Sequence, residues 1–591
     1  MLLLQRASRV RSIASNQSRV NTLIVVSAVF VALFAQLQMY GLRIPAEAAL
    51  SLQCGMLIVD GKIPFIDFME VAAPSSMYFS AIPALVCKIL PTTHPVVIFH
   101  NFVFALAVGS CALTALILFK QKTREQAHVP AFIIACALLN LVMVKEFGQR
   151  EHLFLLGYIP FLVSRWLSWT NQATAKKLSI IAGIAGGVAI ILDPIFLVIA
   201  VLMELYFCVS KQKFVPLMAP EMRAAMVVCV IYLFHFVFSS PNYSNVYFNY
   251  ALPMVICDYI TFDERLWWVN KTPDNREIVY FMMLACSIAL GVRRWCSLIP
   301  PCIALAVVGF GTFVITGKSM TAQMFPMFCG SFLTFALVVS IASNAVLNVR
   351  ALGARLLKPV IVAVIVGICA VSFTYMSTTN HDDLKDVSDL GYSGTYLWTE
   401  ESAFATRLQV ETKPGDKVLI LNDRVRPAYP LLVQFNRRPA SYLLTGYPIR
   451  MSRLLMERDA ANAAKYTGPQ FRMYERLIED IKTVKPKFMM IEKESLGEVL
   501  KEHKVFEVID NLYQEFAYAE WPDRDEQPSF DYYAFRTPLV CYKLKTPTPD
   551  AASAPSATTA PLPTNAPSAP QPPDAAPAPS ASPAPDPSPA P

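Results

Sequence analysis

Charged residues are scarce in this chain: only 16% of its 591 residues are Asp, Glu, Lys or Arg, whereas an ordinary soluble domain has roughly 25%. No two of the 13 cysteines form a CxxC pair, which argues against a zinc site or a disulfide framework. These absences exclude a wholly soluble globular protein and a disulfide scaffold. The 54% of hydrophobic residues and the mean hydropathy of +0.42 exclude a disordered chain.

The sequence contains long apolar runs with few charged residues. A helix needs about 20 apolar residues to cross a bilayer, and eleven runs reach or approach that length. They predict a polytopic α-helical membrane protein with about 11 spans. The first run has no cleavage site close behind it, so we expect an uncleaved span. The runs lie at 21–41, 94–119, 129–144, 152–169, 178–192, 194–209, 223–238, 278–292, 298–316, 324–345 and 358–376.

The basic residues predict how the chain is oriented. Cytoplasmic loops carry an excess of Lys and Arg, and alternate loops of this chain are basic. The N-terminus and these loops are then cytoplasmic, everything after residue 377 is extracytoplasmic, and the apolar stretch 77–90 lies in the interface or re-enters. This arrangement explains the net charge of +7 without a nucleic-acid partner. We expect an integral protein of the bacterial inner membrane. The basic clusters lie at 120–124, 176–177, 211–213, 293–294 and 350–358.

Composition divides the chain into four parts. They are a basic cytoplasmic N-terminus (1–20), a multi-span membrane domain (21–376), an extracytoplasmic domain (377–545) and a Pro/Ala/Ser-rich tail (546–591). The tail has no aromatic residue and no Lys or Arg. It therefore cannot bury a core, and we expect it to be disordered.

The extracytoplasmic domain is predicted to have an α/β fold. Two apolar runs, 417–421 and 487–491, predict buried strands. Between them, segments 451–464 and 470–483 have helical spacing of apolar residues. This order of strand, helices and strand is typical of an α/β unit. Further strands are expected at 505–509 and 539–544.

Ionisable residues of the membrane domain concentrate in five outer loops, which would bring carboxylates and cations to one membrane face. Lys and Arg bind phosphate groups, and a carboxylate can deprotonate a hydroxyl. The pattern therefore predicts chemistry on a lipid-linked phosphate. The alternative is that these loops are polar because they face water. The residues are Glu47, Asp60, Lys62, Asp67 and Glu70, then Lys145 to His152, then Asp193, then Asp258 to Arg265, and last Lys318 with Gln323.

The acidic candidates lie mainly in the first outer loop. Glu47 is a candidate general base, or else an acid favoured near a helix N-terminus by the helix dipole. Asp67 and Glu70 are three residues apart and so lie on one side of a turn. They could supply the base, bind substrate or bind a divalent metal (Mg or Mn), or could simply form a solvated turn. We predict Glu47 and Asp67 as catalytic and Glu70 as substrate-binding.

The remaining candidates are predicted to bind substrate. Lys145, Arg150 and Lys318 would contact the donor phosphate, or else be cations at the ends of spans. Asp193 could pair with Arg150 or with Lys318. The other three substrate-binding candidates are Glu151, His152 and Gln323. The alternative for His152 is that it only caps a span.

Four segments together resemble membrane-embedded GT-C glycosyltransferases, in the branch related to protein O-mannosyltransferases and aminoarabinose transferases. In that family, the first outer loop has an acid after the first span, a Gly-x-x-Pro-aromatic turn and an acid-then-proline segment. The second and third segments resemble later segments of the family, including bacterial relatives, and the fourth resembles the start of the soluble domain in those relatives. The segments are Pro45-Ala46-Glu47 with 60–74 (DGKIPFIDFMEVAAP), 147–152 (FGQREH) with Pro160, 317–326 (GKSMTAQMFP) and 427–430 (PAYP).

The chain departs from the family pattern at three positions. The family's usual catalytic Asp falls on Ala46, with Glu47 in the next acidic position. The usual Pro-Pro pair is reduced to Pro74, and Gln323 stands where the late motif has a histidine.

The resemblance implies a glycosyltransferase that uses a polyprenyl-phosphate-linked sugar as donor and a hydroxyl of a lipid, glycan or protein as acceptor. The sugar would be displaced directly, with inversion at the anomeric carbon. Two other classes remain open. A transporter or flippase of lipid-linked glycans would place its ionisable groups near the midplane and often show inverted repeats. An envelope scaffold would use the tail 546–591 as an anchor.

Overall fold

The computed structural model describes residues 2–39, 42–120, 124–142, 146–172, 174–212, 214–259, 273–316, 321–346, 364, 403–519 and 538–545. The predicted span at 358–376, apart from residue 364, and the tail 546–591 lie outside this set.

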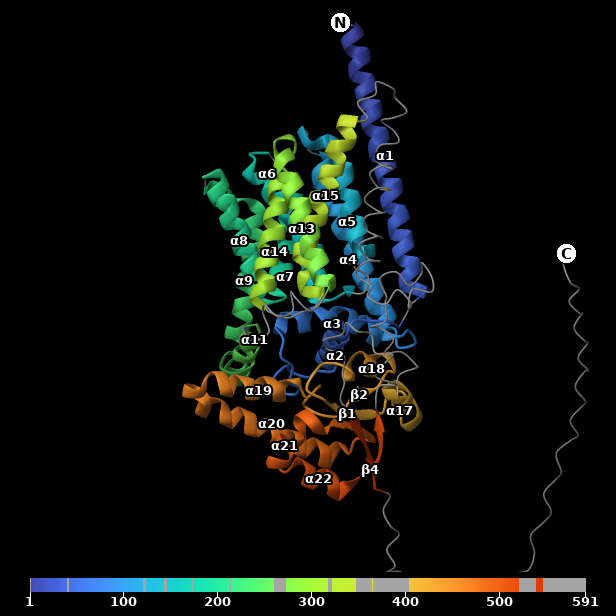
Figure 1. Cartoon of the computed structure of the whole chain (residues 1–591), viewed down its shortest axis with the longest axis vertical. Helices are drawn as coiled ribbons and strands as arrows, with labels where there is room; N and C mark the ends of the chain where they lie inside the picture. The colour runs from blue at the N-terminus through green and yellow to red at the C-terminus, as the bar shows by residue number, and fades with distance from the viewer. Residues whose placement is uncertain are drawn as a thin grey trace, which may run out of the picture. The chain divides into compact units, whose positions relative to one another are not determined.

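Ten of the eleven predicted runs lie on helices of the structure, whose axes run side by side (Figure 1). Among the described residues, six helices are long and apolar enough to cross a membrane, so the chain is a helical membrane protein. The count of eleven spans and the assignment of sides remain predictions. The ten helices are α1 (Leu2–Met39), α4 (Pro95–Lys120), α5 (Val129–Val142), α6 (Arg150–Trp169), α7 (Lys176–Ile191), α8 (Pro194–Lys211), α9 (Pro220–Phe238), α13 (Pro273–Val292), α14 (Ile299–Thr316) and α15 (Phe325–Val346).

Small residues let the helices of the bundle approach closely. Helix α7 packs against both α6 and α9. A Cβ atom at Gly183 would lie 2.2 Å from the carbonyl oxygen of Glu221, and one at Gly186 would lie 2.4 Å from the ring of Phe161. Such close approaches at glycine, to a neighbouring backbone at Gly183 and to a ring at Gly186, are typical of helix packing in membranes. They fix α6, which carries several of the predicted site residues.

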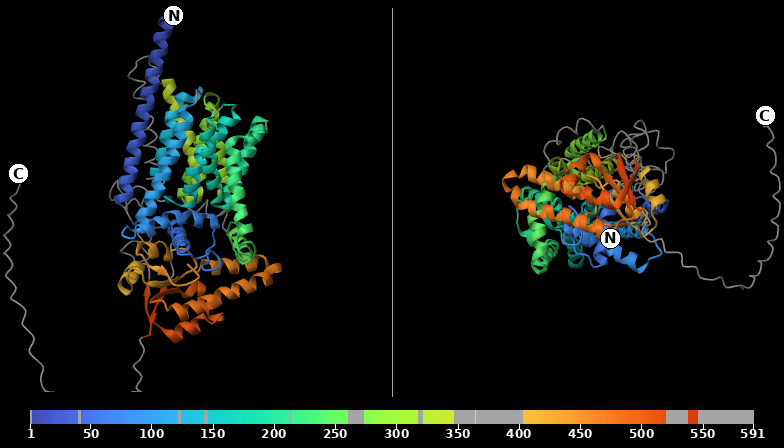
Figure 2. Two further views of the ribbon diagram at one scale, coloured as in Figure 1. Left: turned by 180° about the vertical axis from the view of Figure 1, so that it is seen from behind. Right: turned by 90° about the horizontal axis from the view of Figure 1, so that it is seen from below.

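Short helices lie at the end of the bundle that is predicted to face outward. The chain passes from α2 (Ala46–Val59) through an irregular loop to α3 (Pro74–Ile89), and these two helices pack against each other. Helix α3 covers the stretch 77–90 that was predicted not to span. Figures 1 and 2 show both helices between the bundle and the C-terminal domain. Two more short helices are α10 (Pro241–Val246) and α11 (Leu252–Tyr259), joined by a π-helical turn (Tyr247–Ala251).

The C-terminal domain contains one five-stranded sheet with the order β2-β1-β3-β5-β4. Strands β2, β1 and β3 are parallel, whereas β5 and β4 pair antiparallel. The predicted strands at 417–421, 487–491 and 539–544 are confirmed within one residue. The strands are β1 (Lys417–Leu421), β2 (Arg438–Pro439), β3 (Phe488–Glu492), β4 (Tyr513–Ala519) and β5 (Leu539–Leu544).

The segment 505–509 was predicted as a strand, and this prediction is wrong. Val505–Leu512 forms helix α22, in which Val505 and Ile509 are buried one helical turn apart. A short apolar run cannot be assigned by periodicity alone. The predicted helices at 451–464 and 470–483 correspond to α19 and α20. The helices of the domain are α17 (Ala403–Glu411), α18 (Ala428–Gln434), α19 (Tyr447–Arg458), α20 (Ala463–Val484), α21 (Lys493–Glu502) and α22.

Candidate functional site

Three helices begin close together at the end of the bundle that bears the predicted outer loops. Arg150 is the first residue of α6, Glu47 lies in the first turn of α2, and Asp193 is the N-cap of α8. The carboxylate of Asp193 also accepts a hydrogen bond from the backbone N–H of Ile195 (3.2 Å). Helix N-termini carry partial positive charge and favour acids. Arg150 is in an unfavourable position for a cation unless acids surround it.

Two carboxylates bind Arg150 from different helices. One guanidinium nitrogen lies 2.9 Å from Glu47 Oε2 and the other lies 2.8 Å from Asp193 Oδ2. The side chains of Glu47 and Arg150 are 20% and 19% exposed, whereas Asp193 is 4% exposed. The predicted pairing of Asp193 with Arg150 is confirmed. Among the described residues, these two carboxylates thus share the guanidinium of Arg150.

Glu70 is a further carboxyl group of the same cluster. It is buried, and its Oε2 atom has no hydrogen-bond partner among the described residues. The pKa of Glu70 is raised to about 8, mainly by burial. The backbone N–H of Val71 and the charge of Arg150 lower this pKa, whereas the charges of Glu47 and Asp258 raise it. A carboxyl group that titrates near physiological pH can exchange protons under working conditions.

Asp67 lies three residues before Glu70 but has a different environment. Its carboxylate accepts a hydrogen bond from the backbone N–H of Ile63 (2.8 Å), and its own N–H donates to the carbonyl of Ile63 (2.8 Å). Asp67 therefore closes a turn of the loop. Glu151 is buried next to the cluster, where Arg150 acts on it electrostatically.

His152 and Gln323 are held by local hydrogen bonds. His152 Nδ1 accepts from the backbone N–H of Gly148 (3.0 Å), and its Nε2 contacts the Asn140 side-chain oxygen at 2.9 Å. Two residues along a helix point to nearly opposite sides, so His152 faces away from Arg150. The side-chain oxygen of Gln323 accepts from the Thr316 hydroxyl (2.9 Å).

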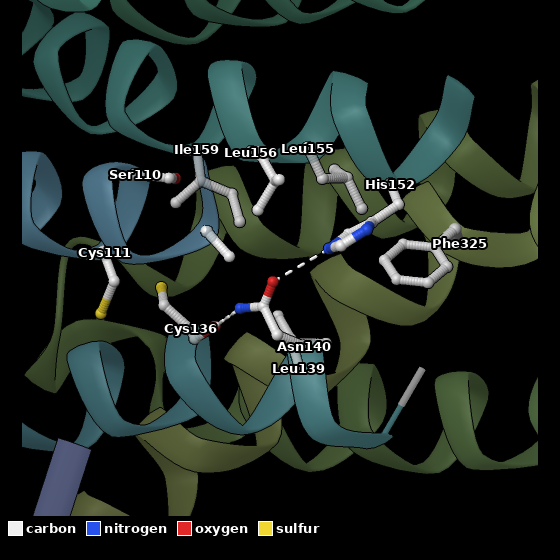
Figure 3. A pocket seen from close by; sticks show the side chains of 11 residues that line it. Ser110, Cys111, Cys136, Leu139, Asn140, His152, Leu155, Leu156, Ile159 and Phe325 are labelled. Carbon is white, nitrogen blue, oxygen red and sulfur yellow. Dashed lines mark hydrogen bonds between the residues drawn. The ribbon is translucent and has the colours of Figure 1, made fainter. Parts of the chain in front are cut away.

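A small cavity lies beside His152 in the bundle, lined also by Asn140 and Phe325 (Figure 3). Its volume is about 20 Å³, which is room for one water molecule. A sugar or a lipid chain does not fit there. This cavity is therefore a feature of the bundle's packing rather than a substrate pocket.

Two predicted cations, Lys145 and Lys318, lie outside the described residues. Within the part of the chain that the structure describes, no three His, Cys, Asp or Glu side chains are arranged to hold a metal ion. The divalent metal that the sequence left open remains a prediction.

The C-terminal domain adds residues that were not predicted as part of the site. The hydroxyl of Tyr447 donates a hydrogen bond to Asp258, one of the charges that act on Glu70. Tyr429 is buried without a partner for its hydroxyl among the described residues, and its pKa is raised by burial and by the charges of Cys54 and Glu70. Tyr429 belongs to the segment 427–430 noted in the sequence, but its proximity to Glu70 depends on packing between distant parts.

The site thus combines a buried carboxyl group that titrates near pH 8, an arginine held at a junction of helix N-termini, and tyrosines from a second domain. These groups can accept a proton and oppose negative charge. No protein-family model matches the chain, and no curated protein matches it in sequence.

Proposed function

We propose that this protein is a membrane glycosyltransferase, which moves a sugar from a polyprenyl-phosphate-linked donor to a hydroxyl group of a lipid, glycan or protein on the outer face. One observation carries the proposal: the buried carboxyl of Glu70 lies within the electrostatic reach of Arg150, at the end of a bundle of apolar helices. A proton acceptor and a fixed cation are the two groups that such a transfer needs.

In the proposed reaction, the acceptor oxygen attacks the anomeric carbon of the donor sugar. The new C–O bond forms while the bond from that carbon to the phosphate oxygen breaks, with inversion. Glu70 takes the hydroxyl proton, and the bonding electrons leave with the phosphate. Glu70 suits the role of base better than Glu47, because the ion pair with Arg150 (2.9 Å) stabilises Glu47 in its charged, weakly basic form.

Arg150 would oppose the charge that develops on the departing phosphate. Glu47 and Asp193 hold its guanidinium from two sides, so it is oriented before substrate binds. Lys145 and Lys318 remain predicted partners of the same phosphate. Asp67, which closes its own turn, is assigned to the shape of the loop.

The test is reconstitution of the purified protein in liposomes with radiolabelled polyprenyl-phosphate sugars and a mixture of lipid and glycan acceptors. We expect Glu70→Gln to lower the transfer rate by about 10²- to 10⁴-fold, as for the loss of a general base. Asp60→Asn is the matched control, because Asp60 is in the same loop and forms an exposed ion pair with Lys88.

Two outcomes would contradict the proposal. If no donor is turned over by the wild-type protein and the labelled lipid crosses the bilayer intact, the chain is a flippase. If sugar is transferred equally by Glu70→Gln and wild type, the reaction does not use this carboxyl group.

A further inference from the structure

The loop between α2 and α3 makes several backbone hydrogen bonds of its own, and residues of the C-terminal domain supply further partners to its polar groups. The Tyr442 hydroxyl donates to the carbonyl of Phe65 (3.1 Å), and the N–H of Met69 donates to the carbonyl of Tyr442 (2.8 Å). Arg476 on α20 donates to the carbonyl of Ile66. Buried backbone groups need such partners, so these contacts hold the loop from Phe65 to Met69, called the clamped loop below.

The backbone of the clamped loop is strained at Phe65. Its φ is +63°, a left-handed conformation that is uncommon for a residue with a bulky side chain. Its ring is buried, and ring centroids lie 5.8 Å away at Tyr243 and 5.4 Å away at Tyr247. Conformations of this kind persist only where the surroundings impose them, and they occur often at functional sites. The hydrogen bond from Tyr442 to Phe65 is one such constraint.

The two clamping side chains are themselves held in place. The N–H of Tyr442 donates to Asp480 Oδ2 (2.6 Å), and the Arg476 guanidinium lies 5.1 Å from the centre of the Tyr442 ring. Both Arg476 and Asp480 belong to α20, so the position of the clamp depends on the folded C-terminal domain.

Glu70 follows Met69 directly, so the clamp fixes the backbone from which the Glu70 side chain projects. Charged or titratable groups from four elements face Glu70. The position of the Glu70 carboxyl group among them decides how strongly each acts on it electrostatically. They are Glu47 and Cys54 on α2, Arg150 on α6, Asp258 on α11 and Tyr429 on α18.

We propose that Tyr442 and Arg476 are positioning residues, through which the C-terminal domain holds the clamped loop and orients the Glu70 carboxyl group toward the reacting atoms. The inference rests on the proposed function for its catalytic consequence. It explains why a membrane enzyme with its chemistry in the outer loops would carry this domain: the loop that bears the base is completed only when the domain is docked.

The experiment compares Tyr442→Phe, Arg476→Gln and the double variant in the full-length protein. Tyr442→Phe keeps the ring beside Arg476 and removes only the hydroxyl. Hydrogen exchange measured by mass spectrometry should show amides of residues 62–70 exchanging about fivefold faster in each single variant, the effect of one lost hydrogen bond, and faster still in the double variant.

The orientation of Glu70 is measured without any need for activity. Dicyclohexylcarbodiimide reacts with protonated carboxyl groups in apolar surroundings, so its labelling of Glu70 as a function of pH follows the titration of that group. The midpoint should lie near pH 8 in the wild type and fall by at least about one pH unit in the double variant, because a loosened loop exposes the carboxyl to water. The pH profile of sugar transfer should shift in the same direction.

Tyr518→Phe and Arg453→Gln are the matched controls, since each removes the same chemical group from an exposed position of the domain. Unchanged exchange and unchanged labelling in the clamp variants would overturn the inference. Faster exchange with an unchanged labelling midpoint would also overturn it, because the loop would then be held without positioning Glu70. A wild-type protein that transfers no sugar would refute the proposed function, whereas the labelling would still decide whether the clamp positions Glu70.

Discussion

Helix α6 carries two arginines in two contrasting charge clusters. Arg150, at its first residue, is 19% exposed and is bound by Glu47 and Asp193. Arg165 is 1% exposed, forms a two-pronged contact with Glu204 (2.7 Å for both bonds) and bonds Glu221 at 2.9 Å. The two arginines are separated by about 22 Å along the helix, at 1.5 Å per residue.

The clusters differ in how their arginine is surrounded. Arg165 also donates to the carbonyl of Pro216 (2.8 Å), and its guanidinium lies 5.6 Å from the ring centre of Trp169. This cluster joins α6 to α8 and α9. Each cluster includes a buried carboxyl oxygen without a partner among the described residues, on Glu221 and on Glu70. The Arg165 guanidinium is nevertheless enclosed between three helices, as in a structural contact, whereas Arg150 is partly exposed at the end of the bundle that bears the predicted outer loops.

The largest expected effect is on folding, from the Arg165 cluster. Arg165→Ala removes the cation that binds the buried carboxylate of Glu221 and the partly buried carboxylate of Glu204, which should lower the free energy of unfolding by about 3–5 kcal/mol. The melting temperature in detergent should fall, together with the yield of folded protein. Arg223→Ala, on the exposed side of α9, should change neither. Equal stability of the two variants would show that the Arg165 cluster does not hold the bundle together.

The next effect is on activity, from the Arg150 cluster. Arg150→Ala should lower the sugar-transfer rate by about 10²- to 10³-fold, in the range for a lost donor to developing negative charge. The lost cation also no longer lowers the pKa of Glu70, so the residual activity should peak at higher pH. Retention of full activity, or a shift of the pH profile toward acid, would argue against the assigned role.

A third effect concerns stability as a function of pH. The pKa of Glu70 is raised from its ordinary value of 4.5 to about 8. The contribution of Glu70 to stability is then fully present below pH 4.5 and is lost as the pH rises to 8, by up to about 1.4 kcal/mol per pH unit. Glu70→Gln should remove this loss. As the pH rises from 5 to 9, the melting temperature of the wild type should therefore fall relative to that of Glu70→Gln. A constant difference between the two melting temperatures would mean that Glu70 titrates normally.

Much of the fold could be predicted from sequence because its signals are local. Long apolar runs predicted the bundle helices, and the runs at 417–421 and 539–544 predicted strands. The segment 505–509 was assigned wrongly because so short an apolar run fits a strand or a helix equally well. The structure decides in favour of a helix, since Val505 and Ile509 are buried on one face of α22.

The site was predicted only in part. The outer-loop acids and Arg150 could be named because ionisable residues stand out among apolar runs, and the pairing of Asp193 was one of two alternatives. The surroundings of Glu70 could not be predicted, because they include Tyr429, which interacts with it electrostatically from more than 350 residues away in the sequence. The roles of Tyr442 and Arg476 could not be predicted for the same reason, because they contact the clamped loop from a distant part of the sequence.

The most direct test of the central claim is the transfer rate of the reconstituted wild-type protein from pH 5 to 9, measured beside Glu70→Gln. The wild-type rate should rise tenfold per pH unit and level off above about pH 8, where Glu70 becomes ionised. Glu70→Gln should be slow and nearly independent of pH. A wild-type rate that is zero, or a variant that keeps the wild-type profile, would contradict the account.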